Sequence, residues 1–373
     1  MKVKITVLLL SVLLTLSILF LSLGALAQEN QELTKVRVGV TPYSMWQIWS
    51  TAHELGIDKE FGLDFEIKEF TSDPNGVRAL ITGDVDITSN AMPQLITDHS
   101  AAPHVVSFVP VGYFQGFIFV GRKDKTRPID ELINEMGAAE AKEFQLKEMK
   151  GKTFLVVPPF KPLVLDAINQ VGLKEEDVNF QFFSDDQKAA MAFITGSGDF
   201  YIGSLPQERR LLEMSDQFIN AGGSEILGPA GLWYDIQCAS QKFIHENKET
   251  SLRLIAVKYR ATRFFDLKQE EFAEIASKTL SRLTGGNFPV DEYITLQTIY
   301  DDFLSIEESL AGCYNSFSPL YLKNPTEYYL KMALEAGDIK EAYTPEEIYK
   351  DAEDLFYELL TRRDLLEKIY APF

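Results

Sequence analysis

The chain has 373 residues, of which 46% are hydrophobic, 12% aromatic and 24% charged. This composition excludes a disordered or low-complexity chain, and the length favours two lobes or domains over a single core. The 36 Lys and Arg residues against 55 Asp and Glu give a net charge of −19, which argues against a nucleic-acid partner because phosphate contacts need a basic surface. Four His and two Cys leave little material for a metal site, so we expect no metal and no cofactor.

The N-terminal segment 1–27 has the features of a secretory signal peptide. Two lysines precede the apolar run Ile5–Leu23, and a small-residue motif ends at Ala27. We predict cleavage after Ala27 and a soluble periplasmic protein. The alternative is an uncleaved anchor, because the apolar run is just long enough to span a bilayer. In an oxidising compartment, Cys238 and Cys313 either form a disulfide or remain two buried thiols.

The first half of the mature chain alternates strand and helix. The buried strand Val36–Val40 leads to a helix that a capping box opens at Ser44 and that Gly56 closes. A second helix is expected from Asp73, which precedes a proline, to Gly83. This alternation is typical of a parallel sheet covered by helices.

The second half repeats this order. Ala192–Gln207 (AFITGSGDFYIGSLPQ) shares seven of sixteen positions with Ala79–Gln94 (ALITGDVDITSNAMPQ), at an offset of 113 residues that also pairs Asp73 with Asp186. A strand is expected at Thr153–Val157, and a helix that begins at residue 184 ends at residue 196. Chance similarity between two generic α/β units is the alternative explanation.

The repeat defines the expected domains. A polar stretch after residue 121 crosses to the second lobe, and a Gly-Pro-Ala-Gly cluster at residues 228–231 ends it. Helix starts of the type cap–Pro–x–Glu, at Asn324 and Thr344, indicate a helical C-terminal region. We therefore expect a signal peptide at 1–27, lobe 1 at 34–121 and 229–300, lobe 2 at 122–228, and C-terminal helices packed on lobe 1 at 301–373.

The candidate ligand site lies beyond the carboxyl ends of the strands, where helices begin, because ligands bind there in open parallel sheets. Hydroxyl, amide and aromatic side chains at these ends suit a small organic ligand, and free N–H groups at helix starts favour a negative charge. Lys161 is the obvious fixed positive charge of the set. The alternatives are helix capping for the serines and core packing for the aromatic residues. The candidate ligand-binding residues are Tyr43, Ser44, Trp46, Ser89, Asn90, Tyr113, Phe160, Lys161, Gly203, Ser204, Trp233 and Tyr234.

Catalytic motifs are missing from the sequence. It contains no Gly-rich phosphate loop, no HExxH and no GxSxG elbow, so we predict no catalytic residues and no enzymatic activity.

Two stretches of the sequence carry a family resemblance. The run VRVGVTP…AHELGIDKEFGLDFEIKEF…DPNGVRALITGDVDITSNAMPQL, and then MKGKTFLVVPPFKPLVLDAINQVGLKEEDVNFQFF, resemble periplasmic solute-binding proteins of ABC transporters. The similar group is the nitrate/sulfonate/taurine type, which includes binders of thiamine-pyrimidine precursors. The resemblance implies an α/β, two-lobed type II periplasmic-binding-protein fold, in which each lobe is a mainly parallel sheet with flanking helices and a helical extension follows.

The resemblance also implies a function. The protein is expected to capture a small organic ligand, anionic or aromatic or both, between its lobes and to deliver it to the permease subunits of an ABC transporter. It would meet the membrane only through the permease or an uncleaved signal. The alternatives are an enzyme on the same fold and a ligand-sensing subunit of a membrane receptor.

Overall fold

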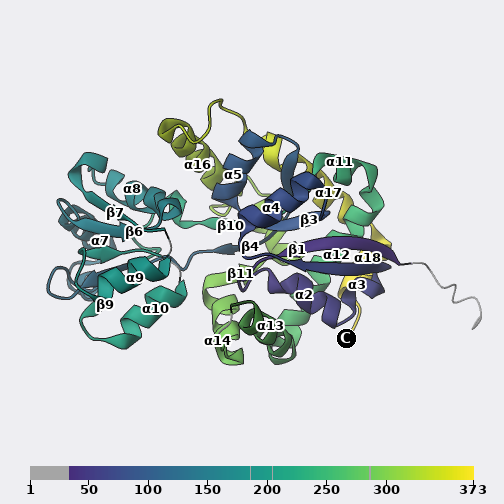
Figure 1. The fold of residues 1–373 in the computed structure, drawn as a ribbon, viewed down its shortest axis with the longest axis horizontal. Helices are drawn as coiled ribbons and strands as arrows, with labels where there is room; N and C mark the ends of the chain where they lie inside the picture. The colour runs from purple at the N-terminus through teal and green to yellow at the C-terminus, as the bar shows by residue number, and fades with distance from the viewer. Residues whose placement is uncertain (1–32, 185, 204, 285–286) are drawn as a thin grey trace, which may run out of the picture.

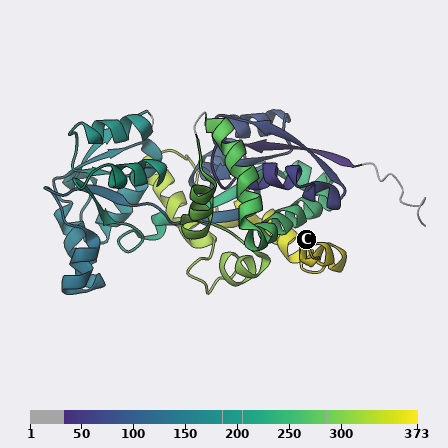
Figure 2. The ribbon, with the colours of Figure 1, turned by 90° about the horizontal axis from the view of Figure 1, so that it is seen from below.

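The computed structural model describes residues 33–184, 186–203, 205–284 and 287–373, so the predicted signal peptide at 1–27 lies outside the described residues. The chain forms two lobes that lie side by side and are joined at a narrow waist (Figures 1 and 2). The strands are β1 (Thr34–Val40), β2 (Leu63–Glu69), β3 (Ile87–Ala91), β4 (Val105–Phe114), β5 (Phe119–Arg122), β6 (Thr153–Val156), β7 (Asn179–Phe182), β8 (Phe200–Tyr201), β9 (Phe218–Gly222), β10 (Trp233–Ser240) and β11 (Asp301–Phe303).

Helices cover both sheets (Figure 1). The helices of the first repeat and of the crossing are α2 (Gln47–Glu54), α3 (Ile57–Glu60), α4 (Asp73–Thr82), α5 (Met92–Ala101), α6 (Ile129–Met136) and α7 (Ala138–Glu148). Those of the second repeat are α8 (Lys161–Asn169), α9 (Asp186–Ile194) and α10 (Leu205–Met214). The remaining helices are α11 (Gln241–Glu246), α12 (Lys248–Leu267), α13 (Gln269–Thr284), α14 (Val290–Thr295), α15 (Ile306–Glu308), α16 (Lys323–Ala336), α17 (Pro345–Leu359) and α18 (Arg363–Tyr370).

Both sheets are mainly parallel, as predicted. In the six-stranded sheet, ordered β2-β1-β3-β10-β4-β11, strands β1 to β4 run in one direction, and β10 and β11 run against them. In the five-stranded sheet, ordered β7-β6-β8-β5-β9, only β5 runs against the others. The predicted two-lobed α/β fold with a helical C-terminal region is confirmed.

The internal repeat is confirmed by the strand order. β2-β1-β3-β10-β4 of the first sheet corresponds to β7-β6-β8-β5-β9 of the second. In each sheet, the antiparallel strand that lies between parallel ones follows directly after a crossing between the lobes: β5 follows β4 into the second sheet, and β10 follows β9 into the first. Each lobe therefore holds one strand that the chain supplies on its way to or from the other lobe.

Side-chain contacts repeat as well. The backbone N–H of Arg37 in β1 donates to Asp86 Oδ2 at 2.8 Å, and the N–H of Thr153 in β6 donates to Asp199 Oδ2 at 2.9 Å. Asp86 and Asp199 are one of the identical pairs at the offset of 113. Each aspartate joins the first strand of its repeat to the segment before the third strand of that repeat, so the identity has a structural cause.

The predicted helix boundaries hold at the glycines but not at Ser44. Gly56 and Gly83 have φ of 73° and 79° and lie at the ends of α2 and α4, a conformation that glycine adopts without strain. The capping box predicted at Ser44 is wrong: α2 begins at Gln47 without a side-chain cap, because the Ser44 hydroxyl donates to Asp301 instead. The capping box at Thr344 is confirmed at the start of α17.

The long helix α12 joins the C-terminal helices to the first lobe. It packs against α2, α3 and α13, and also against α17 and α18, while α17 packs on β4. Thirteen of its residues are buried, which makes it the central support of the lobe. Within the described residues, no helix combines the length and the apolar character needed to cross a membrane.

Candidate functional site

The first lobe places a partly buried aspartate at the start of α4, beside the ends of β1 and β3. Asp73 Oδ1 accepts hydrogen bonds from the hydroxyls of Thr41 at 2.7 Å and Ser89 at 3.0 Å, and both hydroxyl residues are fully buried. Burial raises the pKa of Asp73, the two hydroxyl bonds oppose the shift, and the charge of Asp98 adds to it. Ser89, a predicted site residue, thus holds a carboxyl group at the strand ends.

The second lobe places its own aspartate at the equivalent point. Asp186 begins α9 and accepts a hydrogen bond from the hydroxyl of Tyr201 in β8. Gly203 follows β8 so closely that a Cβ there would lie 2.2 Å from Asp186 Oδ1. Only glycine leaves room for this approach, which accounts for the predicted site residue Gly203. Ser204, also predicted, lies outside the described residues.

A buried glutamate adjoins this second group. Glu208 of α10 is fully buried, and its Oε1 accepts the backbone N–H groups of Gly203 at 3.2 Å and Ile118 at 3.4 Å. Its Oε2 is buried without a hydrogen-bond partner. Burial raises the pKa of Glu208 well above its ordinary value, the two backbone bonds oppose this, and the charge of Asp186 adds to it.

Tyr43 follows β1, near the strand ends of the first lobe. Burial raises the pKa of its phenol, and the charges of Asp73 and Asp186 raise that pKa further. The residue as a whole is 55% exposed.

Asp235 in β10 and Asp301 in β11 form a pair of interacting carboxyl groups in the first lobe. Asp301 Oδ2 accepts the hydroxyl of Ser44 at 2.6 Å and the side-chain amide of Gln297 at 3.0 Å. The carboxyl groups of Asp301 and Asp235 influence each other's pKa, and Asp235 Oδ2 is buried without a hydrogen-bond partner. Burial raises the pKa of Asp301 to about 6, and burial followed by the charges of Asp301 and Asp73 raises that of Asp235.

Buried amides with unsatisfied atoms surround the pair. Gln297 is 1% exposed and lies in a π-helical turn, Leu296–Tyr300, of the kind that recurs at functional sites; its Oε1 has no partner. Gln237 is fully buried with both amide atoms unpartnered, and it shares a face of β10 with Asp235 because alternate strand residues point the same way. Buried polar groups are usually paired, so such atoms mark a place where a ligand can complete the hydrogen bonding.

A cleft opens between the lobes at the edge of this region. A cavity of about 490 Å³ is lined by α10 of the second lobe and by α14 and the residue before it in the first. Its lining residues are Arg209, Arg210, Glu213, Met214, Pro289, Asp291, Glu292 and Thr295. Tyr293 of α14 donates its hydroxyl to the backbone carbonyl of Ser44, which connects the cleft wall to the acidic group.

The predicted aromatic residues divide between the waist and the core. Phe160 and Trp233 meet at 5.7 Å between ring centroids, and both contact Phe117 of the crossing segment. Tyr113 lies edge-on to Tyr234, and its hydroxyl donates to Asp302 at 3.4 Å. The waist is thus lined by aromatic rings from both lobes.

Other predicted residues have partners inside their own lobe. Trp46 and Tyr234 are buried in the first lobe, and the Tyr234 hydroxyl donates to the carbonyl of Leu320. Asn90 is fully buried and donates to Asp98 at 2.9 Å. Lys161 Nζ lies 2.8 Å from Glu175 of the same lobe. As ligand contacts these residues remain predictions.

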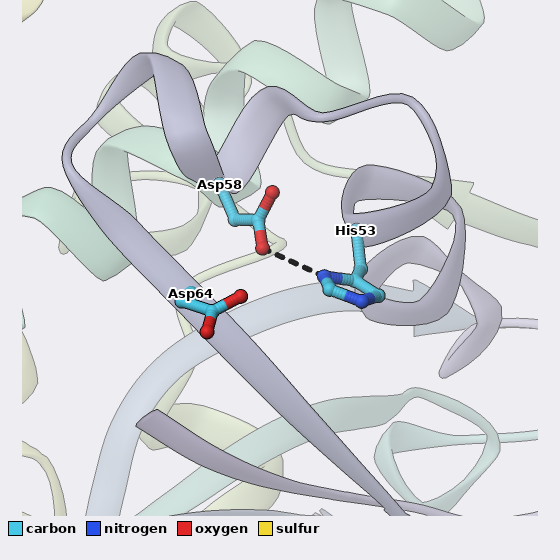
Figure 3. A group of neighbouring side chains, drawn as sticks. All are labelled: His53, Asp58 and Asp64. Carbon is cyan, nitrogen blue, oxygen red and sulfur yellow. Dashed lines mark hydrogen bonds and ion pairs between the residues drawn. The ribbon is translucent and has the colours of Figure 1, made fainter. Parts of the chain in front are cut away.

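A histidine and two aspartates form a separate group on the first lobe (Figure 3). His53, Asp58 and Asp64 bring ligand-type atoms within 4.8 Å of one another. The buried Asp58 already accepts the backbone N–H groups of Lys59 at 2.9 Å and Phe65 at 3.0 Å and lies 2.7 Å from His53 Nδ1. These bonds join α2, α3 and β2, so the geometry accounts for Asp58 as a structural bridge.

Known proteins resemble this chain in structure and not in sequence. No protein-family model and no curated protein sequence matches it. The periplasmic aliphatic sulphonate binding protein SsuA from Escherichia coli superposes with a TM-score of 0.63 at 15% identity, over 87% of this chain and 99% of that one. The periplasmic nitrate-binding protein NrtA from Synechocystis PCC 6803 gives 0.57 at 13% identity, over 91% and 92%.

The description of a third similar structure names the fold. The Candida albicans CA3427 gene product, described as having the generic periplasmic binding protein structural fold, gives a TM-score of 0.55 at 12% identity, over 88% of this chain and 95% of that one. The chain therefore has the fold that the sequence resemblance implied. At these identities the likeness concerns the fold.

Proposed function

We propose that this chain is an extracytoplasmic solute-binding protein that closes its two lobes around a small organic molecule and delivers it to an ABC permease. The observation that carries the proposal is the cleft of about 490 Å³ that α10 of the second lobe and α14 of the first lobe line together. Asp73 and Asp186, which the repeat pairs, begin equivalent helices at the strand ends of the two lobes of a periplasmic-binding-protein fold. In open α/β sheets, ligands bind outside the carboxyl ends of the strands.

Closure by bending at the waist fits the connections between the lobes. The chain crosses after β4 and again after β9, and the rings of Phe117, Phe160 and Trp233 pack there. Two short crossing segments allow a hinge, and a ligand that contacts both lobes stabilises the closed form by its extra contacts there. The protein does no chemistry in this proposal: it captures, encloses and releases.

Export belongs to the same proposal. The segment 1–27 would direct the chain out of the cytoplasm and be removed after Ala27, which puts the cleft where nutrients arrive. Intact-mass measurement of the protein from the periplasmic fraction tests this, and a chain that still carries residues 1–27 contradicts the cleavage.

Interlobe distance measurement tests closure. Spin labels on cysteines placed at Glu213 and Asp291 would report across the cleft, because both residues are exposed and line it from opposite lobes. The native Cys238 and Cys313 are buried and are not expected to take label. A small-molecule extract that contains the ligand should shorten the distance, while a pair within the second lobe, Lys174 and Glu213, should not change. An unchanged interlobe distance, with no small molecule retained after dialysis, contradicts the proposal.

A further inference from the structure

We propose that helix α16 of the C-terminal region is a brace on the hinge between the lobes, and that the hydroxyl of Tyr329 holds the second crossing segment in place. The inference rests on the proposed closure and adds the element that restricts it. The crossing in question is the short turn η3 (Pro229–Gly231), through which the chain returns from β9 to β10. The C-terminal region thereby gains a role beyond packing on the first lobe.

A helix from each lobe packs against this turn. The contacts come from α8 of the second lobe and from α16, which lies at the edge of the first lobe that faces the second (Figure 1). α16 itself is fixed to the first lobe, since it packs on α5 and α17, and the hydroxyl of its buried Thr326 lies 3.2 Å from that of Tyr349 in α17. The turn is therefore held between a part of each lobe.

Ala230 of the turn is hydrogen-bonded to both lobes. Its backbone N–H donates to Asp166 Oδ2 of α8 at 3.1 Å, and its carbonyl accepts the hydroxyl of Tyr329 of α16 at 2.7 Å. All three residues are buried, and buried peptide groups need partners of this kind. Only the φ and ψ rotations of Ala230 lie between its two peptide groups, so a bend that keeps both bonds must turn at this residue.

Tyr329 also connects the turn to the aromatic rings of the waist. Its hydroxyl oxygen accepts the indole N–H of Trp233 at 2.5 Å, so one hydroxyl takes part in two hydrogen bonds. The ring centroid of Trp233 lies 4.8 Å from that of Phe117 in the first crossing and 5.7 Å from that of Phe160 in the second lobe. Loss of this hydroxyl would therefore affect the packing at both crossings.

The turn fits closely against its partners. A Cβ at Gly228 would lie 2.3 Å from Asp166 Oδ2, so the chain passes directly beside this carboxyl group. Without the Tyr329 hydroxyl, the carbonyl of Ala230 and the indole N–H of Trp233 lose their partner, and both can regain one from water when the turn moves away from α16. Further bends at residues 231–233 then become available, and the angle between the lobes becomes less defined.

Interlobe distances in the ligand-free protein test the inference. Spin labels on cysteines placed at Glu213 and Asp291 report across the cleft, and the width of the distance distribution measures how well the lobe angle is defined. Tyr329→Phe keeps the ring and removes only the hydroxyl, and we expect it to give a broader distribution than the parent protein. Asp166→Ala releases the same turn from the second lobe and should also broaden the distribution, whereas Asp166→Asn keeps an acceptor for the N–H of Ala230 and should stay close to the parent.

The control Tyr343→Phe removes a hydrogen bond of the same kind inside one lobe. The hydroxyl of Tyr343 donates to the backbone carbonyl of Ile96 in α5, and both residues belong to the first lobe. This variant should lose stability as Tyr329→Phe does, but it should keep the distance distribution of the parent protein. Urea unfolding followed by circular dichroism compares the stabilities and establishes that each variant is folded.

The outcomes separate the inference from the proposed function. The inference is overturned if Tyr329→Phe gives a distribution no broader than that of Tyr343→Phe or, should that variant not fold, if Asp166→Ala gives none; the proposed closure then stands. An interlobe distance that the small-molecule extract leaves unchanged contradicts the closure, whatever the width of the distribution. The two tests use different readouts, the width without ligand and the shift with ligand, so either can fail alone.

Discussion

Replacing Asp301 by asparagine should stabilise the protein at neutral pH. The residue is 8% exposed, and burial raises the pKa of its carboxyl group from near 3.8 to about 6. The native protein therefore binds the proton more tightly than the unfolded chain does. The stability from this group is fully present below about pH 4 and is lost as the pH rises through about 6, by about 3 kcal/mol in total.

Asparagine imitates the protonated acid in shape and charge. Ser44 can still donate to the remaining oxygen, but one acceptor is lost, so the gain in free energy of unfolding is smaller than about 3 kcal/mol. We expect Asp301→Asn to exceed the parent protein in free energy of unfolding by about 1–3 kcal/mol near pH 7.5, and to lie within about 1 kcal/mol of it near pH 4.

Urea unfolding followed by circular dichroism at the two pH values measures this difference. The control Asp354→Asn changes the same atoms in an exposed pair with Lys350 and should show no gain at neutral pH. The reasoning is refuted if Asp301→Asn is the less stable protein near pH 7.5, or if its difference from the parent is the same at both pH values.

Three further predictions concern the scaffold. Asp86→Ala and Asp199→Ala should each lower the free energy of unfolding by roughly 2 kcal/mol, because each leaves a strand N–H without its charged acceptor; unequal losses in urea unfolding would count against equivalent roles. Asp58→Ala should lower the free energy of unfolding by roughly 3 kcal/mol or more, because two buried backbone N–H groups lose their acceptor. An unchanged melting temperature would disprove the role of Asp58 as a structural bridge. Cys238 and Cys313 should react with a thiol reagent only after denaturation, and a native chain without titratable thiols in denaturant would reveal a disulfide.

The architecture could be predicted from local sequence because each structural signal occurs in both halves of the repeat. Gly83 and Gly196 recur at one offset, and both have positive φ just after a helix. Asp86 and Asp199 recur for the same bond to the first strand of each lobe. Signals that are fixed by backbone geometry survive in the sequence, so the order of strands and helices could be predicted from them.

The chemistry of the site could be predicted only in part. The repeat paired Asp73 with Asp186, but no local pattern indicated that Asp73 would accept the hydroxyls of Thr41 and Ser89, or Asp186 the hydroxyl of Tyr201. Asp235 and Asp301 come from β10 and β11, which reach the site only by pairing with β3 and β4 across a long stretch of chain. No local pattern encodes that pairing.

Side-chain direction explains the remaining difference. Lys161 begins α8 as the sequence suggests, but its flexible side chain extends to Glu175, within its own lobe. Ser44 lies ahead of α2, yet its hydroxyl turns to Asp301, far along the chain. Position on an element was predictable for both residues, whereas the partner depended on the packed structure.

The return of β10 to the first sheet limits how the protein can be divided. The strands β5 to β9 of the second sheet are continuous in the chain, whereas β10 lies between β3 and β4 of the first sheet and reaches it only after the whole second lobe. A fragment that ends at the first crossing would therefore lack a central strand and should be poorly folded alone, while the second lobe keeps every strand of its sheet. The first lobe is completed only after the chain has built the second, so the two lobes differ in how far each can stand alone.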